Sequence, residues 1–359
     1  MQSPLKMVSR RLCAPLVSLA LVCAACSDAV SPHPHPLNDV HLLVLETFDG
    51  SGQAVHPDAA ATPLAWGNSE IGLFATPYPG GNASFENPSL YTRQSLLDWR
   101  VPQGVVNPIE RPVEGYLSDP DEIFNPETNE VWLYYRGVST ENQIFLVRGN
   151  APASWSSPAL VASGINHTIV SPTVVRRGPG DWMMWSVNSG TTGCSGNSTT
   201  VELRNSADGI NWSAPVTTDL FESNLFAWHI DVEWIPARSE FWAIYNVKVS
   251  GSCTTSALHF ARSIDGVHWS IQPGAVLARG AIPAFADIVY RASLLYDESS
   301  GTVTLWYSGA RFEKGGYIWR IATERMTVPN FIERVSTPGN AVTTPSETTA
   351  PPLSNATAP

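Results

Sequence analysis

A tryptophan that recurs at an almost constant spacing limits the folds open to this chain. Trp99, Trp155, Trp212 and Trp269 are separated by 56, 57 and 57 residues. The last two end the same turn signature, Asp-Gly-x-x-Trp, in which Asp-Gly favours a tight hairpin. A period of this length indicates repeated modules of a few strands each.

Apolar strands follow the same period. Five such runs are found, at Gly72–Thr76, Val131–Tyr135, Trp182–Trp185, Phe241–Tyr245 and Val303–Tyr307. Each is preceded by one strand and followed by another, with short polar turns between them. Five modules of this kind predict an all-β fold, a five-bladed β-propeller over residues 39–335. A β-sandwich would not require the period. We expect residues 40–46 to complete the last sheet and so close the ring.

The composition fits this fold and restricts the ligands. Only 15% of residues are charged, and 13 Trp, 26 Gly and 29 Pro favour strands joined by many turns. The net charge of −11 argues against nucleic acid or anionic lipid headgroups as partners. Neutral or cationic ligands fit better.

The N-terminus resembles a targeting segment. Residues 1–25 read as a signal peptide, with Lys6, Arg10 and Arg11 before the apolar stretch Leu12–Val22. The following Cys23-Ala-Ala-Cys26 resembles a bacterial lipoprotein processing site with Cys26 lipidated, and cleavage after Ala25 without lipidation is the alternative. The sequence thus predicts an exported protein, a periplasmic or cell-surface lipoprotein that meets the membrane through its anchor alone. Residues 26–38 form a tether, and residues 336–359 a disordered Thr/Pro/Ser-rich tail.

Two cysteines remain in the propeller region. Cys194 lies 12 residues after Trp182, and Cys253 lies 11 residues after Trp242. Equivalent positions in successive modules lie on neighbouring loops, and export implies an oxidising compartment. A Cys194–Cys253 disulfide is therefore predicted.

The first strand of every module carries a polar triplet. In chain order the triplets are His56-Pro-Asp58, Asp119-Pro-Asp121, Ser171-Pro-Thr173, His229-Ile-Asp231 and Arg291-Ala-Ser293. The outer residues of each triplet are expected to share one strand face, which gives two stacked polar layers around the propeller axis. Such layers either line a water-filled channel or form a ligand site, and the convergence of ten polar groups favours the ligand site.

These features resemble a known superfamily. Short blades with Asp-Pro on an inner strand, together with Asp-Gly-x-x-Trp hairpins, are similar to the five-bladed propeller glycosidases, which include glycoside hydrolase family 43 and the invertase–levansucrase relatives. The resemblance covers about residues 40–335, at the level of repeat and fold. The run through His56-Pro-Asp58, Thr76-Pro-Tyr-Pro79 and Glu86-Asn-Pro-Ser89 also resembles uncharacterised bacterial and phage-encoded propellers, and that likeness implies no activity.

The glycosidase resemblance implies roles for several acids. A first-blade Asp acts as base or nucleophile in those families, which maps onto Asp58, and a second-blade Asp that orients it maps onto Asp119 or Asp121. The third-blade Glu that donates the proton has no counterpart, because that blade offers Ser171 and Thr173. Candidates for the missing acid are Asp231 first, then Glu86 and Glu233. Two carboxylates must flank the scissile bond, about 5–5.5 Å apart for retention and about 6.5–9.5 Å apart for inversion.

The remaining polar and aromatic residues are candidates for substrate binding. Charged and hydroxyl groups suited to sugar hydroxyls are provided by His56, His229, Arg291, Ser171 and Thr173. Tyr290, Trp228 and Tyr78 could stack on sugar faces. No short-range ligand motif such as His-Glu-x-x-His occurs, so no metal site and no required cofactor are assigned, although Ca²⁺ at the axis is physically reasonable.

The sequence therefore predicts an exported, monomeric glycoside hydrolase that cleaves a poly- or oligosaccharide by paired-carboxylate chemistry in the axial pocket. A non-catalytic glycan-binding surface propeller is the alternative, and a lyase or phosphorylase acting on glycans a third.

Overall fold

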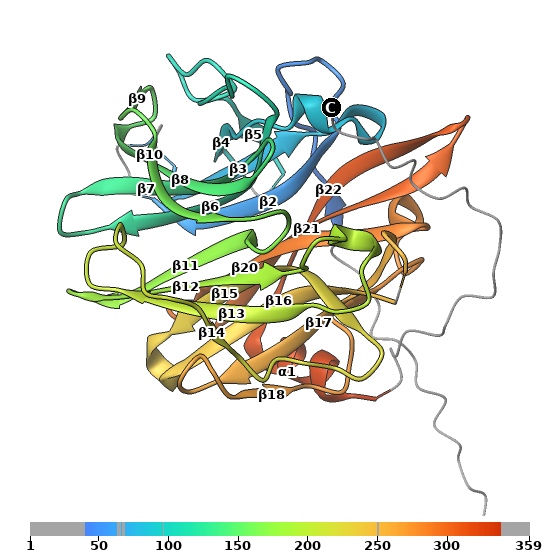
Figure 1. Cartoon of the computed structure of the whole chain (residues 1–359). Coiled ribbons are helices and arrows are strands. Elements are labelled where there is room, and N and C mark those ends of the chain that lie inside the picture. Colours follow the sequence, from blue (N-terminus) through green and yellow to red (C-terminus); the bar gives the residue numbers. More distant parts are fainter. Residues whose placement is uncertain (1–39, 63–65, 67–68, 96, 250, 339–359) are drawn as a thin grey trace, which may run out of the picture. The chain divides into compact units, whose positions relative to one another are not determined.

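The structure is a computed structural model that describes residues 40–62, 66, 69–95, 97–249 and 251–338. Five antiparallel sheets follow one another along the chain (Figure 1). Blade 1 contains β2 (Ala54–Ala61), β3 (Ile71–Pro77), β4 (Ser89–Arg93) and β5 (Trp99–Arg100). Blade 2 contains β6 (Tyr116–Asn125), β7 (Glu130–Val138), β8 (Asn142–Ala151), β9 (Ser154–Trp155) and β10 (Ala159–Gly164).

The other three blades repeat this order. Blade 3 contains β11 (Val170–Gly178), β12 (Asp181–Asn188), β13 (Thr200–Ser206) and β14 (Val216–Thr217). Blade 4 contains β15 (Phe226–Ile235), β16 (Glu240–Lys248), β17 (Thr255–Ser263), β18 (Trp269–Ile271) and β19 (Leu277–Ala278). Blade 5 contains β20 (Ile288–Asp297), β21 (Thr302–Glu313), β22 (Gly316–Thr327) and the N-terminal strand β1 (His41–Leu42).

The first strands of the blades form a closed ring. Each of β2, β6, β11, β15 and β20 contacts the next, and β20 contacts β2. β1 pairs with β22 through His41–Thr323 and Leu42–Ala322, so the N-terminal segment completes the last blade. The five-bladed fold and its closure are thus confirmed.

The hydrophobic core is divided among the interfaces between blades. Along β16, Phe241, Ala243 and Tyr245 pack towards blade 3, whereas Trp242 and Ile244 pack towards blade 5. The same division recurs at the other three interfaces. A middle strand therefore buries both faces, which explains why these strands are continuous apolar runs instead of alternating ones.

The two Asp-Gly hairpins, in blades 3 and 4, dock their blades onto the preceding one. Trp185 of blade 3 donates a hydrogen bond from Nε1 to the carbonyl oxygen of Gly266 in blade 4, at 2.8 Å. The Tyr134 hydroxyl of blade 2 donates a hydrogen bond to the carbonyl oxygen of Gly209 in blade 3, also at 2.8 Å. Gly266 has φ +80°, and a Cβ added there would lie 2.6 Å from the Trp185 ring. The glycine of the signature is therefore required for both the turn and the blade contact.

A short helix lies beyond the last blade. α1 (Val328–Ser336) begins at Thr327, whose side chain accepts a hydrogen bond from the Asn330 amide. Phe331 packs on Trp242 and Phe260, with ring centroids 5.8 and 4.9 Å away. Val328, Phe331, Ile332 and Val335 pack against the core formed with blades 4 and 5. This helix was not expected from the sequence, because its stabilising contacts are with strands distant along the chain. The predicted tail lies almost wholly outside the described residues.

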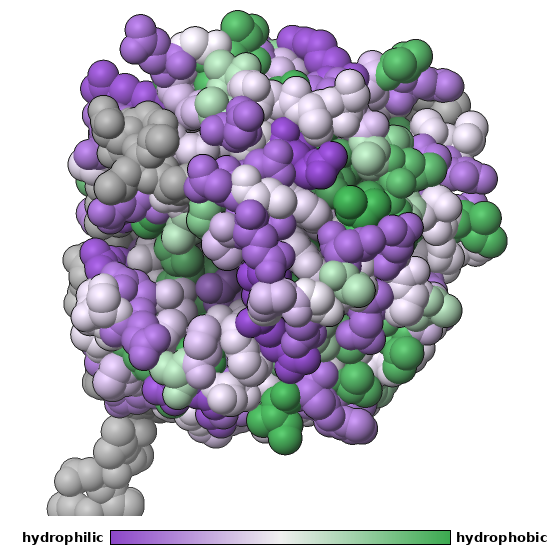
Figure 2. All heavy atoms as spheres, turned by 90° about the vertical axis from the view of Figure 1, so that its left-hand side faces the viewer, coloured by the Kyte–Doolittle hydropathy of each residue, from purple (hydrophilic) through white to green (hydrophobic). Residues whose placement is uncertain are grey.

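Two further features bear on the predicted environment. Cys194 and Cys253 form the predicted disulfide, which fits an oxidising compartment. No helix in the described part of the chain has the length and apolarity to cross a membrane. Figure 2 shows hydrophilic side chains over most of one face, with hydrophobic ones in separate groups. The predicted signal peptide and Cys26 lie outside the described residues.

Candidate functional site

Bulges in the inner strands aim the polar triplets at the axis. The register of all five inner strands shifts at the triplet, for example between Val55 and Asp58 in β2. In blades 1 to 3 the first triplet residue has a left-handed backbone, with φ +52° at His56, +50° at Asp119 and +53° at Ser171. Such φ values are uncommon outside glycine, and they concentrate at functional sites. The two predicted layers therefore arise from a bulge and not from strand alternation alone.

The upper layer brings two histidines onto one carboxylate. Asp119 Oδ1 lies 3.3 Å from His56 Nε2 and 3.3 Å from His229 Nδ1. All three residues are at most 2% exposed. None of these three atoms has a hydrogen-bond partner of good geometry. Buried polar atoms are normally satisfied, so an unsatisfied convergent set indicates that something else belongs between them.

These three atoms, two imidazole nitrogens and a carboxylate oxygen, are of the kinds that coordinate a divalent metal ion. One ligand atom from each of His56, Asp119 and His229 lies within 4.8 Å of the others. Tetrahedral ligands about 2.0–2.1 Å from zinc lie about 3.4 Å from one another, close to the two 3.3 Å separations here. His56 Nδ1 lies 3.0 Å from Thr76 Oγ1 and 3.4 Å from Glu86 Oε2. These contacts favour the tautomer with the proton on Nδ1, in which the Nε2 lone pair faces the cluster.

The protonation states agree with this role. Burial lowers the pKa of His56 well below its usual value, and it also lowers the pKa of His229. Burial opposes ionisation of Asp119, yet Arg136 and the two histidines hold its pKa well below the ordinary range. Burial, and then the charge of Asp119, raises the pKa of Glu86 well above its usual value. Neutral imidazoles and an ionised carboxylate are the forms that bind a cation.

The lower layer is a belt of hydrogen bonds between blades. In each blade the last triplet residue accepts a hydrogen bond from a backbone N–H on the next inner strand. The five bonds are Glu122 N to Asp58 (2.5 Å), Val174 N to Asp121 (2.9 Å), Val232 N to Thr173 (3.0 Å), Leu294 N to Asp231 (2.9 Å) and Ala59 N to Ser293 (3.1 Å). This belt joins all five blades, so these side chains have a structural function.

The belt is tested most directly at the hydrogen bond between blade 5 and blade 1, which closes the ring. Ser293 Oγ is buried and accepts the Ala59 N–H, which joins blade 5 to blade 1. Ser293→Ala leaves that N–H unsatisfied and should lower the free energy of unfolding by about 1–3 kcal/mol. Urea denaturation would measure this, with Ser293→Thr as the control that retains the hydroxyl. An unchanged midpoint in Ser293→Ala would contradict the belt.

Arg291 supplies the positive charge between the two layers. Its guanidinium is fully buried and lies 3.9 Å from Asp58 Oδ1, 4.0 Å from Asp121 Oδ1 and 3.9 Å from Asp119 Oδ1. Burial, and then repulsion from Asp231, raises the pKa of Asp58, and Arg291 opposes that rise. Asp58, Asp121 and Asp231 each offer an oxygen within 4.8 Å of the others. The calcium expected from sequence stays a prediction, and Arg291 offsets part of the negative charge of this cluster.

The structure places the other predicted residues around the upper layer. Tyr290 is half-buried, and its ring centroid lies 5.3 Å from that of His56 and 4.5 Å from that of His229. Trp228 Nε1 donates to the Tyr290 hydroxyl at 3.3 Å. Ser171 joins blade 3 to blades 2 and 4. Its amide donates to Asp119 Oδ2 at 3.2 Å, and its hydroxyl oxygen accepts from the Ile230 amide at 3.3 Å. Glu233 lies two residues after Asp231 on β15, where burial and then Asp231 raise its pKa.

Three important residues were not identified from sequence. Arg136 Nε lies 2.9 Å from Asp119 Oδ2 and fixes that carboxylate, and Asn246 Oδ1 accepts the His229 amide at 2.6 Å. Thr76 is the hydroxyl beside His56. Arg136 and Asn246 lie within otherwise apolar middle strands, and a charge or amide there was the available signal.

Comparison with known proteins places this geometry in context. No protein-family model matches the chain. It is 27% identical over 346 residues to the A type blood N-acetyl-alpha-D-galactosamine deacetylase of Flavonifractor plautii, a match that covers 82% of this chain and 45% of the relative. The chain thus spans less than half of that protein's length.

Solved structures share the fold. An N-acetylgalactosamine deacetylase from F. plautii, in complex with blood group B trisaccharide, superposes with a TM-score of 0.73 and 23% identity, over 83% of this chain and 97% of that one. A thermostable family-43 glycoside hydrolase gives a TM-score of 0.57 at 14% identity, over 84% and 96% of the two chains. The predicted likeness to the five-bladed propeller glycosidases is therefore confirmed for the fold.

Proposed function

We propose that this protein is a metal-dependent deacetylase that hydrolyses the amide of an N-acetylated sugar in a glycan. The observation that carries the proposal is the set of three unsatisfied donor atoms on His56, Asp119 and His229. A relative that is 27% identical over 346 aligned residues is named as a deacetylase of N-acetylgalactosamine, which supports the substrate class.

In this reaction the metal ion and the residues of the chain would have separate roles. When bound, a divalent ion polarises the amide carbonyl and lowers the pKa of water. Glu86, whose Oε2 lies 3.4 Å from His56 Nδ1, would orient that imidazole, and the proton that the attacking water loses would pass to the sugar nitrogen. Water adds to the carbonyl carbon, the C–N bond breaks, acetate leaves, and the sugar amine takes up the proton. Tyr290 is the half-buried residue over the cluster and would contact the sugar.

Glycoside hydrolysis is the second candidate, favoured by the buried carboxylates Asp58, Asp121 and Asp231 and by their raised pKa values. One observation makes it the weaker one. Each of these carboxylates already accepts a backbone hydrogen bond within the belt.

An assay of both products separates the candidates. The full chain would be incubated with an oligosaccharide that ends in α-linked N-acetylgalactosamine, and acetate and free monosaccharide measured by mass spectrometry. We expect acetate without monosaccharide, loss of acetate release after chelation, and recovery with a divalent metal. Metal content by elemental analysis gives an independent readout. Release of monosaccharide would support glycoside hydrolysis. Binding of the oligosaccharide without either product would support the non-catalytic glycan-binding alternative.

Export and anchoring remain part of the proposal. The disulfide supports an oxidising compartment, and the N-terminal pattern ending at Cys26 supports lipidation. We propose that the propeller acts outside the cytoplasm on carbohydrate.

A further inference from the structure

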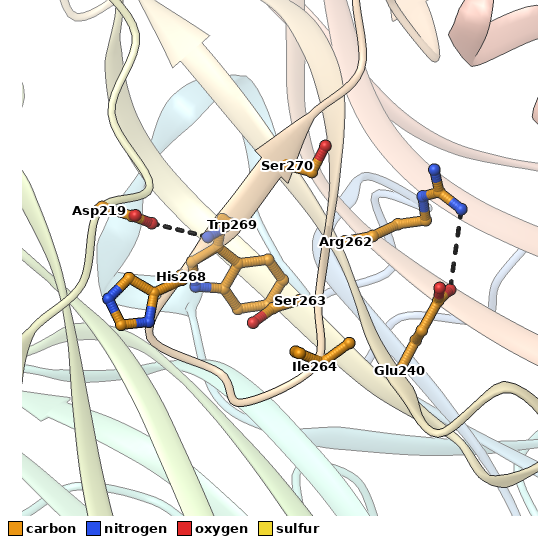
Figure 3. A pocket seen from close by; sticks show the side chains of 8 residues that line it. All are labelled: Asp219, Glu240, Arg262, Ser263, Ile264, His268, Trp269 and Ser270. Carbon is orange, nitrogen blue, oxygen red and sulfur yellow. Dashed lines mark hydrogen bonds and ion pairs between the residues drawn. The ribbon is translucent and has the colours of Figure 1, made fainter.

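A cavity away from the axis lies at the outer edge of blade 4. It has a volume of about 370 Å³ and is lined by residues of β16, β17 and β18, the hairpin between the last two, and Asp219 of the segment after β14. Figure 3 shows the Trp269 indole at its centre, with Arg262 and Glu240 on one side and Asp219 and His268 on the other. We propose that this cavity is a second saccharide-binding site, separate from the catalytic centre.

Part of the lining takes part in the hairpin itself, because Asp219 Oδ1 accepts the Trp269 amide at 2.7 Å and His268 Nδ1 lies 2.7 Å from Asp265 Oδ2. The turn itself is held by Asp265, whose Oδ1 accepts the amides of Val267 and His268 at 2.8 Å each. Trp269 Nε1 donates to the Gly266 carbonyl at 3.1 Å, which fixes the plane of the indole. Arg262 and Glu240 have no part in the turn, so folding of the hairpin does not account for their position.

The chemistry of the lining matches a sugar. A pyranose ring presents C–H groups on its faces and hydroxyls around its edge, so it stacks on an indole while polar groups bind its rim. Here the rim groups are the Arg262 guanidinium, the Glu240 and Asp219 carboxylates and the Ser270 hydroxyl. Arg262 Nη1 lies 3.9 Å from Glu240 Oε2, too far for a hydrogen bond, and Arg262 Nε is buried without a partner. Donor capacity on Arg262 therefore remains for a ligand, whereas Glu240 Oε2 already accepts a hydrogen bond from Trp242 Nε1 at 3.1 Å.

Blade 3 has a cavity at the equivalent place, about 540 Å³ in volume, with a lining that carries fewer charges. The equivalent positions are occupied by Asp181, Asn205, Asn211 and Trp212. Blade 4 has Glu240, Arg262, His268 and Trp269 there and adds Asp219. Hydrogen bonds to charged groups are stronger than neutral ones, so the blade 4 cavity is the one assigned to a saccharide. The choice of a saccharide rests on the proposed function, but binding at this cavity does not require the axial chemistry.

Binding to immobilised glycopolymers tests the assignment. The full chain would be passed over polyacrylamide carrying N-acetylgalactosamine or galactose, in a His229→Ala background that disables the axial site. We expect Trp269→Ala to weaken binding about fivefold to tenfold, through loss of stacking. Arg262→Gln, which preserves the indole and the turn, should weaken it at least twofold. Trp212→Ala in blade 3 is the matched control and should change it little.

The outcomes separate this site from the proposed activity. Binding that survives His229→Ala and falls with Trp269→Ala supports the site, whether or not acetate is ever released. With His229 intact, the Trp269→Ala variant should also retain full turnover of a small oligosaccharide. Binding unaffected by both Trp269→Ala and Arg262→Gln, binding abolished by His229→Ala alone, or no binding of either polymer would overturn the proposal.

Discussion

His229→Ala is expected to lower acetate release about a thousandfold while the protein remains folded. The substitution removes one of the three donor atoms that converge on the axis, and a metal ion contributes several kcal/mol to stabilising a hydrolytic transition state. The backbone amide of residue 229 keeps its bond to Asn246, so the strand should hold its register. Metal content per chain should fall together with activity, and circular dichroism would report the fold.

Asp58→Asn is the matched control for this variant. Asp58 lies one layer below, and an asparagine oxygen can still accept the Glu122 amide. Under the deacetylase proposal this variant retains most of its acetate release and binds metal normally. A large loss of turnover in Asp58→Asn, with full turnover in His229→Ala, would instead assign the chemistry to the lower carboxylates and support glycoside hydrolysis.

Arg291→Met is expected to produce the largest loss of stability, about 3–5 kcal/mol. Breaking a buried ion pair by removing one partner leaves uncompensated charge, here on Asp58 and Asp121. Arg291 is fully buried between both layers, so water cannot replace it without opening the ring. Chemical denaturation of the full chain would measure the free energy of unfolding.

Two further variants separate charge from general packing effects. Arg291→Lys keeps a positive charge and should restore part of the lost stability. Arg311→Met removes an exposed arginine paired with Glu313 at 2.8 Å, and an exposed pair contributes less than about 1 kcal/mol. If Arg291→Met were no more destabilising than Arg311→Met, Arg291 would not be the counter-charge of the axial acids.

Much of the fold could be predicted because the repeat is local. Spacing of the tryptophans and the apolar middle strands identified the five modules, and a chain of five such sheets can bury both faces of each only by closing a ring. The Cys194–Cys253 pair followed from equivalent positions in two modules. Helix α1 was missed, because its contacts with Trp242 and Phe260 are with distant strands.

The site was predicted less completely. Sequence alone identified the ten residues of the two layers, since polar triplets on buried strands require a shared environment. It could not divide them by function, because Asp58 and Asp119 are both acids next to proline. Only the tertiary structure shows that Asp58 accepts a strand amide whereas Asp119 faces two histidines. His56, Asp119 and His229 come from three blades, so no local motif could join them, and distances across the ring depend on how the blades close.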